Sequence, residues 1–349
     1  MFRMITALAW ANILLIFVCL VPLWRNEHWL VRSLDFPRLQ FSVALVIVLL
    51  ADLLILDLVR PVNWILIAGV GACLCFQAWW ILPYGAWHKK EVGDAAAPDP
   101  DNTLSLITAN VLTPNRNAEA LIALVRQCRP DILVTLESDS WWQQRLDTLD
   151  TDYPYSIKCP LDNLYGMHVY SRLPLMNPRV EYLVEDDVPS MYADVVLPSG
   201  QRIQAHFLHP APPSPTENET SGPRDKELVM VARLARGVGG PRLVTGDLND
   251  VAWSETTRLF RKISGLLDPR VGRGMFNSFH AKFWFCRWPL DHLFVSHHFT
   301  LSGIRRLAPY GSDHFAIFAE LVLAPGNGQK GNGPEADSDD KAFARDKIS

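Results

Sequence analysis

Three apolar stretches near the N-terminus constrain the fold of this 349-residue chain more than any other feature. They cover residues 5–24, 41–58 and 63–82. Each has about the 20 residues that an α-helix needs to cross a hydrocarbon core of roughly 30 Å. A cleaved signal peptide would explain the first stretch alone, but two more follow, and no small-residue cleavage pattern lies near Trp24. The sequence therefore predicts a membrane domain at residues 1–90 with three transmembrane helices.

One acidic residue lies well inside the second stretch. Asp52 would be costly if it faced lipid, so we expect it to face another helix or a second copy of the chain. A proton-relay or substrate-binding role for Asp52 is the alternative. Asp57 lies nearer the end of the stretch, where it can meet Arg60 at the membrane interface.

Basic residues near the apolar stretches give a weak signal for membrane sidedness. Three crossings place the N-terminus and the remainder of the chain on opposite sides. The side of the soluble domain has Arg25, Arg32, Arg38, Lys89 and Lys90, and the other side has Arg3 and Arg60. Read literally, this bias favours a cytoplasmic soluble domain. The margin is small, because Glu27 and Asp35 lie in the same loop as the first three arginines.

The rest of the chain predicts one soluble domain between a linker and a tail. Residues 91–102 contain an Ala-Ala-Ala-Pro-Asp-Pro-Asp run typical of a linker, and residues 324–349 predict a disordered tail. Residues 103–323 have the size of a single domain. Strand patterns alternate there with helical ones, and a Pro198-Ser199-Gly200 turn predicts a hairpin. This mixture favours an α/β sandwich over a uniform parallel βαβ repeat.

The charge balance counts mildly against a dedicated DNA-binding protein. The chain has 33 Lys and Arg against 37 Asp and Glu, which gives a net charge of −4. Proteins that bind duplex DNA usually present a basic face, because neutralising phosphates supplies much of the affinity. A small phosphate-bearing substrate remains compatible with this composition.

Polar motifs follow several of the predicted strands. Glu137 ends the apolar run Ile132–Leu136, where a carboxylate suits Mg²⁺, although most glutamates at strand ends are simply solvated. In Gly246-Asp247-Leu248-Asn249, the acid can activate a water and the amide can hold a phosphate oxygen. A plain Asp/Asn turn is the alternative for that motif.

Two histidines and two further acids extend this set. His209 follows a strand and precedes a Pro-rich loop, so it can contact a phosphate or protonate a leaving oxygen. In Ser312-Asp313-His314, a bend is needed for both the acid and the imidazole to serve one site. Asp291 can orient His314, as carboxylates orient catalytic histidines. Asn110 ends the first strand and can donate to a phosphate oxygen; a local turn or capping role is the alternative for His209 and Asn110.

This ordered set resembles the endonuclease/exonuclease/phosphatase superfamily over about residues 103–323. The superfamily includes deoxyribonuclease I-like nucleases, repair enzymes, sphingomyelinases and inositol-phosphate phosphatases. The matching positions are Asn110, Glu137, Arg172 in Ser171-Arg172-Leu173-Pro174, His209, Asp247, Asn249, Asp291, Asp313 and His314. The resemblance implies a four-layer α/β sandwich of two packed mixed sheets flanked by helices.

The same resemblance implies a role for each matching residue in hydrolysis of a P–O bond. Glu137, with Asp313 nearby, would hold Mg²⁺, with Mn²⁺ as the alternative ion. Asp247 would position or activate the water, and Asn110, Arg172 and Asn249 would bind the phosphate. Asp291 would pair with His314, which would contact the phosphate oxygens. His209 would act on the phosphate from the opposite side.

The membrane helices bear on the choice of substrate. Membrane-anchored bacterial members that resemble this architecture act as prenyl-diphosphate phosphatases facing the cell exterior. The resemblance therefore favours a lipid-linked phosphate and an extracytoplasmic domain on the bacterial inner membrane, against the charge count. Val111 follows Asn110 where many repair-type members carry an acid, which weakens the link to abasic-site nucleases. A membrane-tethered nuclease and a non-catalytic scaffold are the alternatives, and the oligomeric state is open.

An aromatic segment at residues 275–288 precedes Asp291 and should border the site. Part of it can be strand core. If instead Phe283, Trp284 and Trp288 are exposed, they can enter the bilayer interface beside the site, with Lys282 and Arg287 meeting lipid phosphates.

Overall fold

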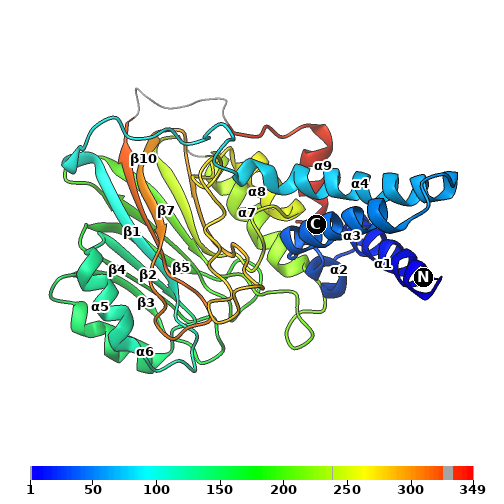
Figure 1. The fold of residues 1–349 in the computed structure, drawn as a ribbon. Helices are drawn as coiled ribbons and strands as arrows, with labels where there is room; N and C mark the ends of the chain where they lie inside the picture. The colour runs from blue at the N-terminus through cyan, green and yellow to red at the C-terminus, as the bar shows by residue number, and fades with distance from the viewer. Residues whose placement is uncertain (1, 238, 325–332, 349) are drawn as a thin grey trace.

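A computed structural model describes residues 2–237, 239–324 and 333–348 (Figure 1). Three long helices project from one side of an α/β domain, near helices α8 and α9. They are α1 (Phe2–Leu20), α3 (Arg38–Ile55) and α4 (Pro61–Ile81). All three are long and apolar enough to cross a membrane, which confirms the three spans at this level.

Asp52 faces another helix of the bundle, which was one of the two positions expected for it from the sequence; the other was a contact with a second copy of the chain. Its Oδ1 accepts a hydrogen bond of 2.9 Å from Asn12 Nδ2 in α1, and both side chains are fully buried. Elsewhere in the bundle the helices pack through the small and branched side chains Cys19, Leu45, Val70 and Cys73. Asn12 therefore pairs one carboxylate oxygen of this acid within the same chain.

The soluble domain contains two mixed sheets packed face to face. The six-stranded sheet has the order β10-β11-β1-β2-β4-β3, and the five-stranded sheet has the order β5-β6-β7-β8-β9. The pairs β1–β2 and β7–β8 are parallel, and the other neighbours are antiparallel. The strand bounds are β1 Thr103–Asn110, β2 Ile132–Leu136, β3 Tyr155–Cys159, β4 Met167–Ser171, β5 Leu175–Glu181, β6 Ser190–Val196, β7 Arg202–Leu208, β8 Arg242–Asp247, β9 Asp291–Val295, β10 Phe299–Arg306 and β11 Ile317–Leu323.

Helices cover the outer face of each sheet, which completes the four layers that the resemblance implied (Figure 1). On the six-stranded sheet lie α5 (Ala118–Cys128) and α6 (Ser140–Leu146), continued by the 3-10 helix η4 (Asp147–Leu149). On the five-stranded sheet lie α7 (Gly222–Gly237) and α8 (Glu255–Ser264). The largest apolar cluster lies between the sheets and includes Leu106, Val134, Val169, Phe207 and Leu293.

Local sequence signals explain several of these elements. All five residues of β2 are buried, as expected for an apolar run inside a covered sheet. The predicted hairpin joins β6 to β7, with Gly200 at φ +81° in the turn. The helix α8 is not among the elements predicted from the sequence, although Ser254 caps its N-terminus and Gly265, at φ +71°, ends it.

The loop between the first two spans packs directly on the soluble domain. It contains the 3-10 helix η1 (Val21–Leu23) and the short helix α2 (Trp29–Ser33). Trp253 Nε1 donates to the Asp35 carbonyl at 2.8 Å, and Tyr84 in η2 (Leu82–Tyr84) donates to the Ala252 carbonyl at 2.7 Å. The loop and the domain therefore lie on one side of the bundle, as three crossings require.

The segment predicted as a linker is packed against the domain. Val92 is fully buried, and Glu91 forms a buried ion pair with Arg261 of α8. The backbone of Asp94 forms an isolated β-bridge with Leu301 of β10. The 3-10 helix η3 (Pro100–Asn102) then leads into β1. The ion pair and the bridge fix this segment, so its Ala- and Pro-rich composition does not make it a free tether.

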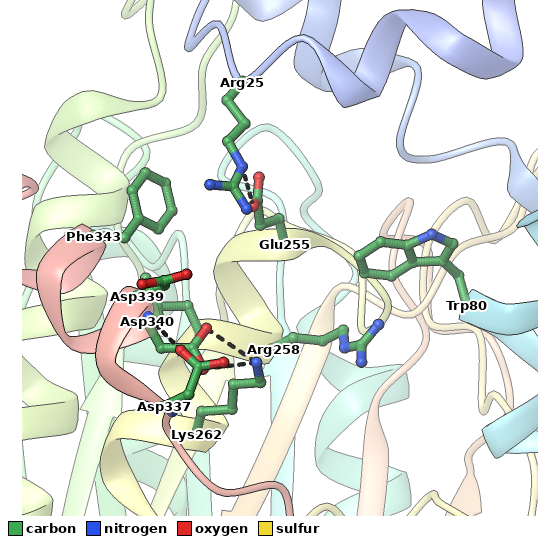
Figure 2. Close-up of a pocket in the computed structure, with 10 residues that line it drawn as sticks. Arg25, Trp80, Glu255, Arg258, Lys262, Asp337, Asp339, Asp340 and Phe343 are labelled. Carbon is green, nitrogen blue, oxygen red and sulfur yellow. Dashed lines mark hydrogen bonds and ion pairs between the residues drawn. The ribbon is translucent and has the colours of Figure 1, made fainter.

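The C-terminal segment differs from the expectation of a disordered tail. Residues 325–332 lie outside the described residues, but α9 (Ser338–Asp346) is a helix with a capping box between Asp337 and Asp340. Lys262 of α8 pairs with Asp340 at 2.8 Å (Figure 2). Lys347 bridges Glu27 of the first loop and Asp225 of α7. Caps and ion pairs, which composition does not reveal, hold this segment.

Candidate active site

The predicted site residues gather where parallel strands of both sheets end. Asn110 is the last residue of β1 and Glu137 follows β2, while His209 follows β7 and Asp247 ends β8. Both parallel pairs place their carboxyl ends at one edge. The two sheets touch there, because Thr108 Oγ1 and Thr245 Oγ1 are 2.8 Å apart. The fold thus brings four separate motifs together.

The backbone is strained or tightly packed at the points where it presents these side chains. Glu137 has φ +57° and Asn249 has φ +49°, and a glutamate adopts this left-handed region only at some cost. Gly246, at φ +152°, lies against the Leu208 carbonyl, and a Cβ there would approach that oxygen to 1.8 Å. Residues other than glycine that adopt the left-handed backbone conformation, as Glu137 and Asn249 do here, cluster at functional sites in proteins.

Asn110 links the two central carboxylates. Its Nδ2 donates to Glu137 Oε1 at 2.7 Å and to Asp247 Oδ2 at 3.1 Å. Asp247 Oδ1 in turn accepts from the Asn249 backbone N–H at 2.9 Å. Asn110 and Asp247 are each 1% exposed, so these bonds hold both acids in fixed orientations.

Asp291 and His314 form the predicted pair. His314 Nδ1 lies 2.7 Å from Asp291 Oδ2, and its Nε2 lies 3.5 Å from Asp247 Oδ2. Ser312 to His314 lie in a bend before β11, and this bend lets both Asp313 and His314 reach the pocket. Burial alone would lower the pKa of His314, but the Asp291 and Asp247 carboxylates raise it to about 10. The two carboxylates thus favour the protonated form of the imidazole.

Two buried acids lack full charge compensation. Burial raises the pKa of Glu137 to about 7 and that of Asp247 to about 7, against the opposing effects of neighbouring hydrogen bonds and His314. Glu137 Oε2 is buried and has no hydrogen-bond partner in the part of the chain that the structure describes. A bare, buried carboxylate oxygen fits a hard divalent cation, which prefers oxygen ligands.

The site thus holds a candidate acidic metal centre. Ligand atoms of Asp247, Asp291 and His314 lie within 4.8 Å of one another. Because Asp291 already occupies the imidazole Nδ1, this trio is better described as a hydrogen-bonded relay. Glu137 and Asp313, both lining the pocket, are the better candidates for metal ligands.

His209 is present as a neutral imidazole. It is 2% exposed, and burial together with the nearby His314 lowers its pKa to about 3. Its Nδ1 has no hydrogen-bond partner among the described residues. The next residue, Pro210, accepts a 3.0 Å hydrogen bond from Asn249 Nδ2 and so ties the two loops together. A neutral imidazole at this position can donate its one N–H to a phosphate oxygen.

The catalytic pocket has a volume of about 470 Å³ and two unlike walls. We call one the sheet-end wall; it consists of Glu137, His209, Asp247, Asn249, Asp313 and His314. We call the other the membrane-loop wall; it consists of Arg32, Ser33, Phe36 and Pro37. Phe36 meets Trp288 edge-on at 5.6 Å between ring centroids. The membrane-loop wall is not predicted from the sequence, because a contact over more than 100 residues leaves no periodic signal.

Arg172 does not belong to this site, which corrects its predicted role in phosphate binding. It follows β4, which runs antiparallel to β2, so it lies beside the start of β2 and Glu137 beside its end. Its guanidinium is 40% exposed and lies 3.9 Å from Asp131. The strand direction placed it at the opposite edge of the sheet.

The aromatic segment is exposed in part. Phe283 is 51%, Trp284 78% and Phe285 56% exposed. Trp288 is half-buried against Phe36 and Phe279, so the expectation of exposure is wrong for this residue. Gln40 in the first turn of α3 donates to the Phe285 carbonyl at 2.8 Å. The exposed aromatics thus lie beside the end of a candidate span.

Comparisons with known proteins agree with this geometry. The profile of the Endonuclease/Exonuclease/phosphatase family matches residues 107–314, more than half of the chain. No curated protein matches the chain in sequence. The fold is similar to that of D. rerio TDP2 in complex with a single strand DNA product, with TM-score 0.55 and 17% identity, covering 63% of this chain and 99% of that one.

Two further solved structures show the same fold. The human Nocturnin catalytic domain with a bound sulfate anion aligns with TM-score 0.53 and 16% identity, over 65% of this chain and 97% of that one. An endonuclease/exonuclease/phosphatase from Beutenbergia cavernae aligns with TM-score 0.52 and 16% identity, over 64% of this chain and 72% of that one.

Proposed function

The chain belongs to the endonuclease/exonuclease/phosphatase family of metal-dependent phosphoric ester hydrolases, and from this premise we propose that it hydrolyses a lipid-linked phosphate or diphosphate at a membrane surface. The bond cleaved is a P–O bond. Mg²⁺, with Mn²⁺ as the alternative, is the proposed metal. The supporting observations are the composition of the pocket and its position beside the three apolar helices.

One observation carries the choice of substrate. The catalytic pocket is closed on one side by the loop that joins two candidate membrane spans. A substrate that fills the pocket around Asp247 therefore lies next to Phe36 and Pro37, close to the ends of those spans. A phosphate carried on a lipid is already held at that level, whereas a duplex would have to fit beneath the bilayer.

Apolar side chains near the pocket support the same substrate class. Phe36, Phe279, Trp288 and Leu290 line the catalytic pocket along with its charged residues. The exposed Phe283 and Trp284 lie on the loop that Gln40 ties to the start of α3. Aromatic side chains are favoured at the membrane interface, where they contact both lipid and headgroup. A lipid tail can leave the pocket along this aromatic surface.

The residues of the chain divide the reaction between them. Asp247, held by Asn110, accepts a proton from the attacking water or orients it. Asn249 and the neutral His209 each donate a hydrogen bond to a phosphate oxygen, and protonated His314 stabilises the charge that develops on these oxygens. Asp291 fixes the ring orientation of His314. A divalent ion on Glu137 and Asp313 would supply further stabilisation of that charge.

For location, we propose the inner membrane of a bacterial cell with the catalytic domain outside the cytoplasm. Reporter fusions at the C-terminus test this placement. An alkaline phosphatase fusion should be active and a green fluorescent protein fusion dark. The reverse pattern would place the domain in the cytoplasm, in agreement with the charge count, and would leave the proposed chemistry unchanged.

Mg²⁺-dependent hydrolysis of a substrate panel tests the function, with the product of each substrate measured: free phosphate, phosphocholine, or cut DNA. The panel comprises a prenyl diphosphate, a phosphoinositide, sphingomyelin, plasmid DNA and single-stranded DNA, with the Asp247→Ala variant as the inactive control. We expect release from a lipid-linked substrate in mixed micelles. Cleavage of DNA alone would replace the proposal with a membrane-tethered nuclease, for which the similarity to D. rerio TDP2 with its DNA product is the argument. No turnover of any substrate would favour a binding or scaffold role.

A further inference from the structure

A second pocket lies where the membrane bundle meets the soluble domain (Figure 2). Its volume is about 290 Å³, and it shares no lining residue with the catalytic pocket. Arg25 and Trp80 come from the membrane domain, while α8 and the α9 segment supply the remainder. The α8 residues Glu255, Arg258, Leu259 and Lys262 form its floor. We call this the junction pocket.

Most of the charges in the junction pocket are already satisfied by one another. Arg25 Nε pairs with Glu255 at 2.8 Å, and Lys262 pairs with Asp340 at 2.8 Å. The Asp337 side chain accepts from the Asp340 backbone N–H and caps α9. Within the described residues, three charged groups in the lining form no ion pair, namely Arg258, Asp337 and Asp339. The cap of α9 already uses the Asp337 side chain, which leaves Arg258 and Asp339.

Arg258 is a fixed cation with free hydrogen-bond donors. Its guanidinium carbon lies 4.4 Å from the centre of the Trp80 ring, and the side chain is half-buried. No side-chain hydrogen bond or ion pair joins it to another residue in the parts of the chain described here. Stacking on an indole holds a guanidinium in place while leaving its edge open, which is the geometry that recognises a phosphate.

Asp339 supplies the opposite charge on the other side of the junction pocket. Figure 2 shows Arg258 and Trp80 on one side, and Asp339 and Phe343 on the other. Asp339 is exposed in the first turn of α9. The lining has four acids against three bases, so a simple anion would meet net repulsion, and a simple cation would leave Arg258 unpaired. A ligand with both charges satisfies both groups.

The level of the junction pocket relative to the membrane indicates where such a ligand comes from. Trp80 is the last residue but one of α4, and Arg25 lies shortly after η1 at the end of the first span. Span ends lie at the boundary between hydrocarbon and headgroups. We propose that the junction pocket binds a phosphate–ammonium zwitterion of the phosphoethanolamine type, with the phosphate on Arg258 and the ammonium group on Asp339. Its source is the headgroup of a neighbouring phospholipid.

Native mass spectrometry of the full chain tests this site through binding and not through turnover. The protein, carrying Asp247→Ala so that bound lipid is not consumed, is titrated with phosphatidylethanolamine, with phosphatidylglycerol of the same chains, and with soluble phosphoethanolamine. We expect saturable binding of phosphatidylethanolamine and little binding of phosphatidylglycerol. Arg258→Ala should weaken binding roughly 10- to 100-fold, the usual worth of a hydrogen bond to a charged group.

Two matched variants control the experiment. Asp339→Asn is isosteric and exposed, so it should weaken binding without disturbing the fold, even if Arg258→Ala proves unstable. Arg145→Ala removes an arginine that also lies over a tryptophan ring, Trp141 at 5.3 Å. Both residues belong to α6, which lies far from the membrane helices (Figure 1). This variant should leave lipid binding unchanged.

The outcomes separate the source of the ligand from its chemistry. Tight binding of soluble phosphoethanolamine would support the zwitterion site and assign it to a water-soluble ligand. Equal binding of phosphatidylglycerol, or full retention of phosphatidylethanolamine by both Arg258→Ala and Asp339→Asn, would overturn the proposal. None of these outcomes depends on the reaction proposed for the catalytic pocket.

Discussion

The two walls of the catalytic pocket differ in origin and in chemistry. The sheet-end wall comes from strand ends of one domain and contains buried carboxylates and imidazoles. Asn110 joins Glu137 to Asp247, and Asp291 holds His314. The membrane-loop wall comes from a segment between two candidate spans and presents Phe36 and Pro37. We infer that the first wall can act on any phosphate and that the second selects which phosphate reaches it.

The largest expected effect comes from removing Asp247, the proposed base of the sheet-end wall. Asp247→Ala should lower kcat roughly 10³-fold or more on every substrate, because it removes the group placed to accept the water's proton. Phosphate release at saturating substrate is the measurement. Asp162→Ala, which changes an exposed acid outside the pocket, is the control. Retained activity in Asp247→Ala would contradict the mechanism.

A second variant tests the metal role of the same wall. Glu137→Gln keeps the shape of the side chain but removes the charge from its unpartnered oxygen. We expect metal affinity to fall about 10- to 100-fold, with activity partly recovered at high Mg²⁺. Calorimetric titration with Mg²⁺ measures this directly. Unchanged affinity would move the metal away from Glu137.

The pH dependence of stability offers a third test. Burial raises the pKa of Glu137 in the folded state to about 7, so the folded state keeps a proton that the unfolded state releases above about pH 4.5. Without metal, this group should therefore cost stability as pH rises from 4.5 to 7, by at most about 3 kcal/mol.

Thermal unfolding at several pH values, with and without Mg²⁺, measures the effect. Mg²⁺ should reverse the loss, because it binds the ionised carboxylate in the folded state. Glu137→Gln should make the metal-free profile less steep between pH 4.5 and 7, and the slope that remains comes from other buried acids such as Asp247. A profile identical to that of the unchanged chain would mean that Glu137 is ionised without a metal.

A smaller and more selective effect is expected from the membrane-loop wall. Phe36→Ser should raise KM for a lipid-linked substrate about 10-fold, because it removes half-buried apolar contact beside Trp288. A soluble short-chain analogue should be unaffected. Trp87→Ser, at an exposed aromatic outside the pocket, is the matched control. Equal losses on both substrates would remove the distinction between the two walls.

The same comparison applies to the aromatic loop. The double variant Phe283→Ser, Trp284→Ser should slow hydrolysis of a bilayer substrate severalfold, since both side chains are exposed beside the start of α3. Activity on the soluble analogue should stay unchanged. A vesicle assay run beside a micelle-free assay measures the ratio, and a parallel fall in both would argue for a purely structural loop.

The smallest expected effect concerns the residue that the structure moved out of the site. Arg172→Ala should change kcat and KM less than twofold, because its guanidinium lies near Asp131, away from both walls. A large loss of phosphate affinity in the standard assay would restore the role that sequence comparison gave it.

Much of the sheet-end wall could be predicted from short motifs. Glu137, His209, Asp247, Asn249, Asp313 and His314 all line the pocket, and Asn110 and Asp291 support it through hydrogen bonds. Each follows or begins an apolar run, so the sequence placed it at a strand end. Arg172 also follows such a run, but the run does not reveal which way the strand points.

Amino-acid composition was a poorer guide to whether a segment is ordered, where ion pairs between side chains hold that segment. Residues 91–102 and 338–346 look mobile by content, yet Glu91 pairs with Arg261, and Asp340 pairs with Lys262. Such pairs join positions about 80 to 170 residues apart, and no local pattern marks the partner.

The sequence by itself determined the three apolar spans, the strand-end placement of the catalytic residues and the chemistry available to them. These depend on local properties, namely the length of an apolar run, its period and the residue that follows it. Only the tertiary structure decided that the loop between two spans forms a wall of the active site, that Asn12 pairs with Asp52, and that Arg258 and Asp339 face one pocket. Those outcomes depend on strand direction and on contacts between distant segments, which packing free energy selects and local sequence does not encode.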